Sequence, residues 1–161
     1  MKKLLFITIC LAAACSLHAK KAEPSIDVIP QPESISIQKG TFKVKGAGFN
    51  YDSTLDPATV QFIAKLADDI YVGCGRPSSL AEAAGVNSGT PIEALKGVYF
   101  FKDATMEPEE YKIEINNRAA KIVASDHNGF LYAIFTFRQL LPVELWTGKT
   151  AAADRKSTRL N

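Results

Sequence analysis

The sequence predicts an α+β fold, with a small, mostly antiparallel sheet and helices packed on one face. Short runs in which apolar and polar residues alternate, typical of half-buried strands, occur at several places in the chain. Two longer stretches, 56–73 and 130–141, carry apolar residues at helical spacing. Since strands and helices bury their apolar faces against each other in layers, we expect one sheet covered by two helices.

The early part of the domain has the pattern of a hairpin. Apolar residues alternate with polar ones over 35–37 and again over 42–44, and a glycine-containing turn at 38–40 separates the two runs. Such a pair of runs predicts two antiparallel strands. The prolines within 30–32 favour an extended path before this hairpin, and residues 49–51 are expected to form a short third strand.

A long amphipathic helix is predicted next. Asp56 is a favourable N-cap, Pro57 suits the first helical position, and Gly73 supplies the stop. The following stretch, 74–96, is rich in Gly, Pro, Ser and Ala. It has only a weak helical signal, at 80–84.

The clearest strand pattern lies in the last third of the chain. Residues 98–101 predict a buried strand, and 103–109 a loop. The alternating runs 111–115 and 120–124 predict a hairpin whose turn is Asn116-Asn117, because Asn tolerates positive φ.

The last predicted element is a second amphipathic helix. A turn at 125–129 precedes it, and Pro142 ends it. Its apolar residues recur at helical spacing and are Phe130, Ile134, Phe137 and Leu141.

Residues 1–19 have the features of a secretory signal peptide: two lysines, an apolar run and small residues. The run is shorter than the roughly 20 apolar residues that a membrane-spanning helix needs. Cleavage after Ala19 is favoured, and lipidation of Cys15 in a loose lipobox is the alternative. We therefore expect an exported bacterial protein that begins with the segment 20–25. It would be periplasmic, outer-membrane-associated or extracellular, and bound to a membrane only if Cys15 is lipidated.

The last eight residues, 154–161, resemble the translation of a sequencing-library adapter, so we expect them to have no biological role. The whole chain has 19 basic and 17 acidic residues and a formal net charge of +2. Residues 1–19 contain two of these basic residues, and 154–161 contain three more together with one aspartate. The remainder thus has 14 basic and 16 acidic residues, and no clustered positive face that would bind nucleic acid.

The central residues are expected to form one domain, 26–142, followed at 143–153 by the start of a linker. About 120 residues suffice for a single core and are too few for two domains. Cys74 would be the one cysteine left after signal cleavage, and its expected role is that of a small apolar core residue.

Residues that could carry chemistry are few. The glutamates of 107–110 lie in a predicted loop, and Asp68 and Asp69 lie on the polar face of a helix, so we expect all of them to be solvated. His127 follows Asp126 in a turn; the pair could form an acid–base dyad, although an ordinary turn histidine is commoner. No metal-ligand spacing or phosphate-binding glycine loop occurs. We therefore predict no catalytic, cofactor-binding or metal-binding residue, and no cofactor.

Five stretches of the sequence occur in an order that is typical of one protein family. They are the opening residues Val28–Pro32, the residues Gly40–Phe42, the strands Glu110–Ile115 and Lys121–Ser125, and the final helix Gly129–Pro142 with its Gln-Leu-Leu. This series, over nearly all of residues 26–142, resembles the N-terminal domain of bacterial family 20 glycoside hydrolases. Three positions of the helix depart from the family's usual residues: Leu131 for an aromatic, Ala133 for Gly, and Phe135 for Gln.

The resemblance implies the non-catalytic N-terminal domain of a β-N-acetylhexosaminidase, truncated before its catalytic barrel. Such an enzyme is implied to cleave terminal N-acetylhexosamine from glycans, with the substrate's own acetamido group as nucleophile. Its Asp-Glu pair lies in the barrel, which needs about 250 residues, so this chain alone is expected to be inactive. Its expected partners are that barrel and, through the barrel, the glycan. Tyr132, Phe135 and Gln139 on the last helix are the candidate contacts with the barrel.

Two alternatives remain open. The domain type also precedes other glycosidase barrels, such as those of α-glucuronidases. A stand-alone carbohydrate-binding or surface-adhesion module would need exposed aromatic rings, whereas Phe62, Phe130 and Phe137 have core spacing. Trp146 is expected in the connection to the barrel. Together with Phe135 and Leu140, it should leave apolar surface partly uncovered.

Overall fold

The structure is a computed structural model that describes residues 26–37 and 40–147. The predicted signal peptide with Ala19 and Cys15, the segment 20–25 and the tail 154–161 lie outside the described residues. So do residues 38–39 of the predicted first turn and most of the predicted linker.

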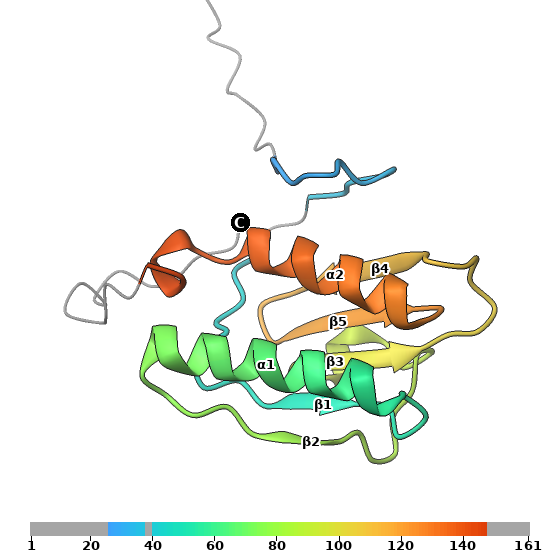
Figure 1. The fold of residues 1–161 in the computed structure, drawn as a ribbon, viewed down its shortest axis with the longest axis horizontal. Coiled ribbons are helices and arrows are strands. Elements are labelled where there is room, and N and C mark those ends of the chain that lie inside the picture. Colours follow the sequence, from blue (N-terminus) through green and yellow to red (C-terminus); the bar gives the residue numbers. More distant parts are fainter. Residues whose placement is uncertain (1–25, 38–39, 148–161) are drawn as a thin grey trace, which may run out of the picture.

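The described chain forms one five-stranded sheet with both of its α-helices on the same face, as Figure 1 shows. The strand order across the sheet is β2-β1-β3-β5-β4. The predicted α+β class with helices on one face is thereby confirmed. None of these helices is long and apolar enough to cross a membrane. In chain order the elements are β1 (Phe49–Tyr51), α1 (Pro57–Cys74), β2 (Leu80–Glu82), the 3-10 turn η1 (Ile92–Ala94), β3 (Gly97–Lys102), β4 (Tyr111–Ile115), β5 (Ala119–Ala124), α2 (His127–Leu140) and the 3-10 turn η2 (Val143–Leu145).

The directions of the strands correct the expectation of a mostly antiparallel sheet. β1 runs parallel to both β2 and β3, and β3 runs parallel to β5. Only the pairing of β4 with β5 is antiparallel. Alternation along one strand shows that one face is buried, but it does not show which strand lies beside it. Here long connections return the chain in the same direction, as parallel pairing requires.

The predicted first hairpin is not formed. Residues 35–37 and 42–44 adopt no strand in the structure. Phe42 and Val44 are nevertheless buried in the core, whereas Ile35 and Ile37 are exposed. The alternating pattern of the second run therefore came from an extended segment that buries every other side chain without pairing with another strand.

The helix α1 begins as predicted and ends later than predicted. Asp56 is its N-cap, and the carboxylate accepts a hydrogen bond of 2.9 Å from the backbone N–H of Thr59. The helix continues through Gly73 to Cys74 and stops at Gly75, which has a φ of +66°. The predicted short helix at 80–84 is wrong, because residues Leu80–Glu82 form the strand β2.

The hairpin of β4 and β5 is confirmed, but its turn works differently from the prediction. Among the described non-glycine residues, only Glu109 has a positive φ. The side-chain carbonyl of Asn116 instead accepts hydrogen bonds of 2.8 Å from the N–H groups of Arg118 and Ala119. The next predicted turn, 125–129, is largely the first turn of α2, since Asp126 is the N-cap of that helix.

The main core lies between the sheet and the two helices. Its aromatic centre is a stacked pair, Phe49 of β1 and Phe100 of β3, with ring centroids 6.3 Å apart. Cys74 is buried here, as expected. A smaller cluster on the opposite face of the sheet, around Phe101, is covered by the loop that contains η1. Buried Lys121 belongs to this second face, and its ammonium donates a 2.9 Å hydrogen bond to the carbonyl of Thr90 in that loop.

Candidate domain interface

The helix α2 presents two aromatic side chains to solvent. Its inner side, which includes Phe130 and Phe137, is buried in the core. On its outer side Tyr132 is 44% exposed and Phe135 is 57% exposed. Large apolar side chains exposed together on one element often mark a surface that contacts another protein. Their role in an interface remains a prediction.

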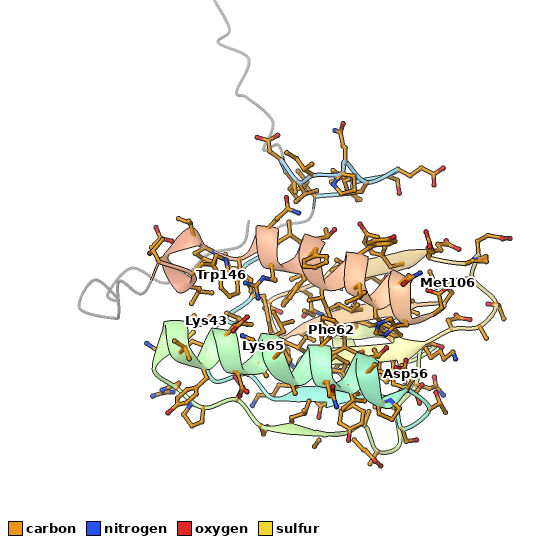
Figure 2. The ribbon with its side chains drawn as sticks, viewed as in Figure 1. Lys43, Asp56, Phe62, Lys65, Met106 and Trp146 are labelled. Carbon is orange, nitrogen blue, oxygen red and sulfur yellow. The ribbon has the colours of Figure 1, made fainter. Side chains whose placement is uncertain are left out.

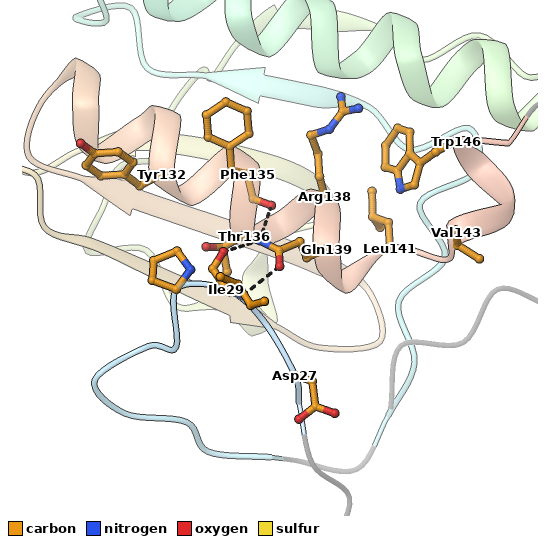
Figure 3. Close-up of a pocket in the computed structure, with 11 residues that line it drawn as sticks. Asp27, Ile29, Tyr132, Phe135, Thr136, Arg138, Gln139, Leu141, Val143 and Trp146 are labelled. Atoms are coloured by element: carbon orange, nitrogen blue, oxygen red, sulfur yellow. Dashed lines mark hydrogen bonds between the residues drawn. The ribbon is translucent and has the colours of Figure 1, made fainter.

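Both aromatic residues line an open groove of about 770 Å³, drawn in Figure 3. The groove lies between α2, the residues that follow it, and a stretch from the start of the described chain. We call that stretch, residues 26–32, the leading segment. Most of the groove is apolar, and the apolar residues beside Tyr132 are Ile29, Pro30, Phe135, Leu141, Val143 and Trp146.

Gln139, the third predicted interface residue, joins the leading segment to α2. Its side-chain carbonyl accepts a hydrogen bond of 2.9 Å from the backbone N–H of Ile29. Its amide nitrogen donates one of 2.8 Å to the backbone carbonyl of the same residue. Figure 3 shows these contacts as dashed lines. The sequence prediction missed Ile29, because a contact between residues 110 positions apart has no local signal.

A chain of contacts beside the groove runs from Trp146, the C-cap of η2, through Arg138 to α1. The Arg138 guanidinium lies 4.2 Å from the centre of the Trp146 ring, and it donates a hydrogen bond of 2.6 Å to the Asp69 carboxylate. Lys65 also pairs with Asp69. Burial alone would raise the pKa of Asp69, but the hydrogen bonds from Lys65 and Arg138 outweigh it and lower that pKa. The prediction that Asp69 is merely solvated is therefore wrong, since it links α1 to α2.

A second polar cluster lies at the opposite end of α1, where Figure 2 labels Asp56. The Thr59 hydroxyl donates a hydrogen bond of 2.6 Å to the Asp56 carboxylate and lies 2.7 Å from Nδ1 of His127. These bonds from Thr59 lower the pKa of Asp56. Phe62, expected in the core, is instead exposed on α1, with its ring centroid 5.7 Å from that of His127.

The acid–base dyad of Asp126 and His127, the less favoured of the two expectations for this turn, is not formed. His127 points Nδ1 at Thr59, whereas the Asp126 carboxylate accepts hydrogen bonds from the N–H groups of Gly129 and Glu109. These two bonds lower the pKa of Asp126. The buried hydroxyl of Thr59 donates to the carboxylate that caps α1 and contacts a ring nitrogen of α2, so this cluster joins the first turns of the two helices.

The glutamates of 107–110 are exposed, as expected. Glu110 accepts a hydrogen bond from the N–H of Glu107, and Glu109 accepts one from Asn128 in the first turn of α2. Across residues 26–37 and 40–147, no group of three or more His, Cys, Asp or Glu could hold a metal ion. The feature of the described chain that best fits a functional surface is therefore the groove.

One family model matches most of the chain. The family model described as glycosyl hydrolase family 20, domain 2, matches residues 25–154. A comparison with curated protein sequences gave no match.

Solved structures with a similar fold include a β-N-acetylhexosaminidase from Streptomyces coelicolor A3(2), at 20% identity and a TM-score of 0.62. That alignment covers 86% of this chain and 26% of the other. An exo-β-N-acetylglucosaminidase from Vibrio harveyi has 21% identity and a TM-score of 0.52, with coverages of 71% and 16%. A β-N-acetylhexosaminidase from Bacteroides fragilis has 20% identity and a TM-score of 0.51, with coverages of 83% and 23%. The chain thus spans about a quarter or less of the length of these proteins, and the likeness concerns the fold.

Proposed function

The chain belongs to glycosyl hydrolase family 20 as its domain 2, and from this membership we propose that it is the non-catalytic supporting domain of an exported β-N-acetylhexosaminidase. The parent enzyme would hydrolyse terminal N-acetylhexosamine residues of glycans. The names of the structurally similar proteins, which are hexosaminidases or a glucosaminidase, support this substrate class.

The observation that carries the supporting role is the apolar groove along α2. Phe135 and Tyr132 expose aromatic surface there, and covering the exposed half of such a side chain contributes about 1 kcal/mol. The catalytic domain of the same parent chain is the proposed partner, because family 20 domain 2 belongs to enzymes that have one. The glycan would then be bound by the catalytic domain and not by this one.

The family match favours this role over a stand-alone carbohydrate-binding module, and the contacts of Trp146 limit the surface that such a module could use. A sugar-binding aromatic ring needs a free face on which the sugar can stack. One face of the Trp146 ring is covered by the Arg138 guanidinium, which Asp69 holds in place. This contact gives Trp146 a structural role on one face of its ring, and only the other face could stack on a sugar.

Export is proposed from the residue pattern of the first 19 positions. Cleavage after Ala19 would give a mature protein that begins at Lys20, whereas the alternative route would give one lipidated at Cys15. Mass spectrometry of the protein recovered from an expressing bacterium distinguishes the two products. Recovery of the uncleaved chain from the cytoplasm would contradict the proposal.

An enzyme assay tests the proposed function. With a nitrophenyl glycoside of N-acetylglucosamine, we expect no release of nitrophenol by this chain above the uncatalysed rate. The full-length enzyme that carries this domain should release nitrophenol readily. Release by the chain alone would overturn the supporting role, and an inactive full-length enzyme would overturn the proposed substrate class.

A further inference from the structure

We infer that the leading segment forms the second wall of the surface on which the catalytic domain docks, and that Gln139 is the residue that positions this wall. The inference rests on the proposed function. It goes beyond that function by naming a second part of the interface, distant in sequence from α2, and the contact that holds it there.

The side chain of Gln139 holds the leading segment against α2 through two hydrogen bonds. A single side-chain amide pairs with both the N–H and the carbonyl of Ile29, as a neighbouring strand would. No backbone–backbone hydrogen bond joins residues 26–37 to the rest of the described chain. Val28 is buried and provides a second anchor. The position of the leading segment therefore depends on few contacts, of which Gln139 supplies both hydrogen bonds to Ile29.

The segment held in this way exposes apolar surface. The side chain of Ile29 is 83% exposed although the backbone of the same residue is fixed. Ile29 and Phe135 both line the groove, and Val143 is exposed at the same groove. An exposed isoleucine and an exposed phenylalanine held at one groove are expected where a single partner buries both side chains.

The position of the chain identifies the partner. Val143 and Trp146 line the groove, so the described part of the chain ends at its edge. The structurally similar proteins are several times longer than this chain, which covers 16–26% of them. The charged lining residues are Asp27 and Arg138, of opposite sign, and Arg138 is paired with Asp69. A nearly neutral apolar groove fits the apolar surface of a folded domain, and the catalytic domain of the same parent chain is the occupant that we infer.

The test compares Gln139→Ala and Gln139→Glu with the control Gln61→Ala in the full-length enzyme. Gln61 is an exposed glutamine on α1 and does not line the groove. Two quantities are measured: hydrogen exchange of the peptide containing Ile29, and the rate of proteolysis at the junction after residue 147. The second rate follows the population in which the domains are undocked.

Gln139→Ala removes both hydrogen bonds to Ile29, and Gln139→Glu removes the one that the amide donates. Both variants should therefore raise both rates by about five- to tenfold, and Gln61→Ala should change neither. Faster exchange at Ile29 with unchanged proteolysis would show that the segment is not part of the interface. Unchanged exchange would show that Gln139 does not position the segment. Phe135→Lys separates this inference from the proposed function: if it alone increases proteolysis, docking through α2 stands and the inference fails.

Discussion

At the scale of single residues, Gly73 marks the closest approach between α1 and η2. A Cβ atom at this position would lie 2.2 Å from the backbone carbonyl oxygen of Leu145. Replacing an ordinary helical glycine with alanine stabilises a protein by about 1 kcal/mol. Here the clash with Leu145 outweighs this stabilisation, so we expect Gly73→Ala to lower the free energy of unfolding by about 1–3 kcal/mol. Urea denaturation measures this change.

Gly89→Ala is the matched control for that prediction. A Cβ atom at Gly89 would meet only the side chain of Asn87, at 3.3 Å. Its effect on the free energy of unfolding should be below about 0.5 kcal/mol, as for most surface substitutions. A stabilised Gly73→Ala variant would show that η2 does not lie against α1 in solution.

At the scale of secondary-structure elements, both α-helices begin with an aspartate cap. The pKa of Asp56 and that of Asp126 are lowered by hydrogen bonds from the first turns. A carboxylate whose folded pKa is depressed contributes stability that is fully present above its unfolded pKa, about 4, and lost as the pH falls through the lower folded value. The free energy of unfolding should therefore decrease with acidification below about pH 4.

The double variant Asp56→Asn, Asp126→Asn tests this assignment. Asn caps helices about as well as Asp but does not titrate, so the decline in acid should become shallower. Stability near pH 7 should fall by about 1 kcal/mol, because the second oxygen of Asp126, which accepts from the N–H of Glu109, is replaced by a donor. The decline should not vanish, because the pKa values of Asp69 and Glu114 are lowered as well. A decline as steep as that of the unmodified protein would assign the acid sensitivity to other groups.

The elements that could be predicted from the sequence are those whose signals are local. The cap and first turn of α1, the strand at β3 and the hairpin of β4 and β5 follow from residues a few positions apart. The direction and order of the strands depend on pairings such as Phe49 with Val98, which no local pattern encodes. Residues 42–44 were predicted to form a strand but do not, although Phe42 and Val44 are buried. Alternating burial of side chains therefore does not require a partner strand.

The residues of the candidate site likewise differ in whether the sequence alone could predict them. Tyr132, Phe135 and Gln139 could be selected because they lie on one helix that resembles a family pattern. Ile29 and Asp69 were missed as contributors, since the contacts of both with α2 are formed only in the fold. A pattern within one helix predicts which side is exposed, but not which distant segment lies against it.

At the scale of the whole molecule, the open groove predicts self-association of the chain in the absence of its catalytic domain. Phe135 and Val143 expose apolar surface there, and Ile29 adds more. We expect the average mass measured by analytical ultracentrifugation to rise with concentration. Phe135→Lys should shift the distribution towards the monomer, because a charge at the groove opposes apolar contact between copies.

Tyr71→Lys is the control for this effect. Tyr71 is also an exposed aromatic residue, but it lies on α1 and does not line the groove. An equal shift by both variants would indicate general solubilisation rather than contact through the groove.

The position of α2 in the core has a consequence for the synthesis of the protein. Phe130 and Phe137, which complete the main core, follow β3 in the sequence. At about 5–20 residues per second, α2 is completed roughly 2–8 seconds after β3. During this interval α2, one of the two helices that cover the sheet, is still incomplete, so part of the apolar face of the sheet is exposed. The nascent chain should therefore be a good client for ribosome-associated chaperones until the last helix has been translated.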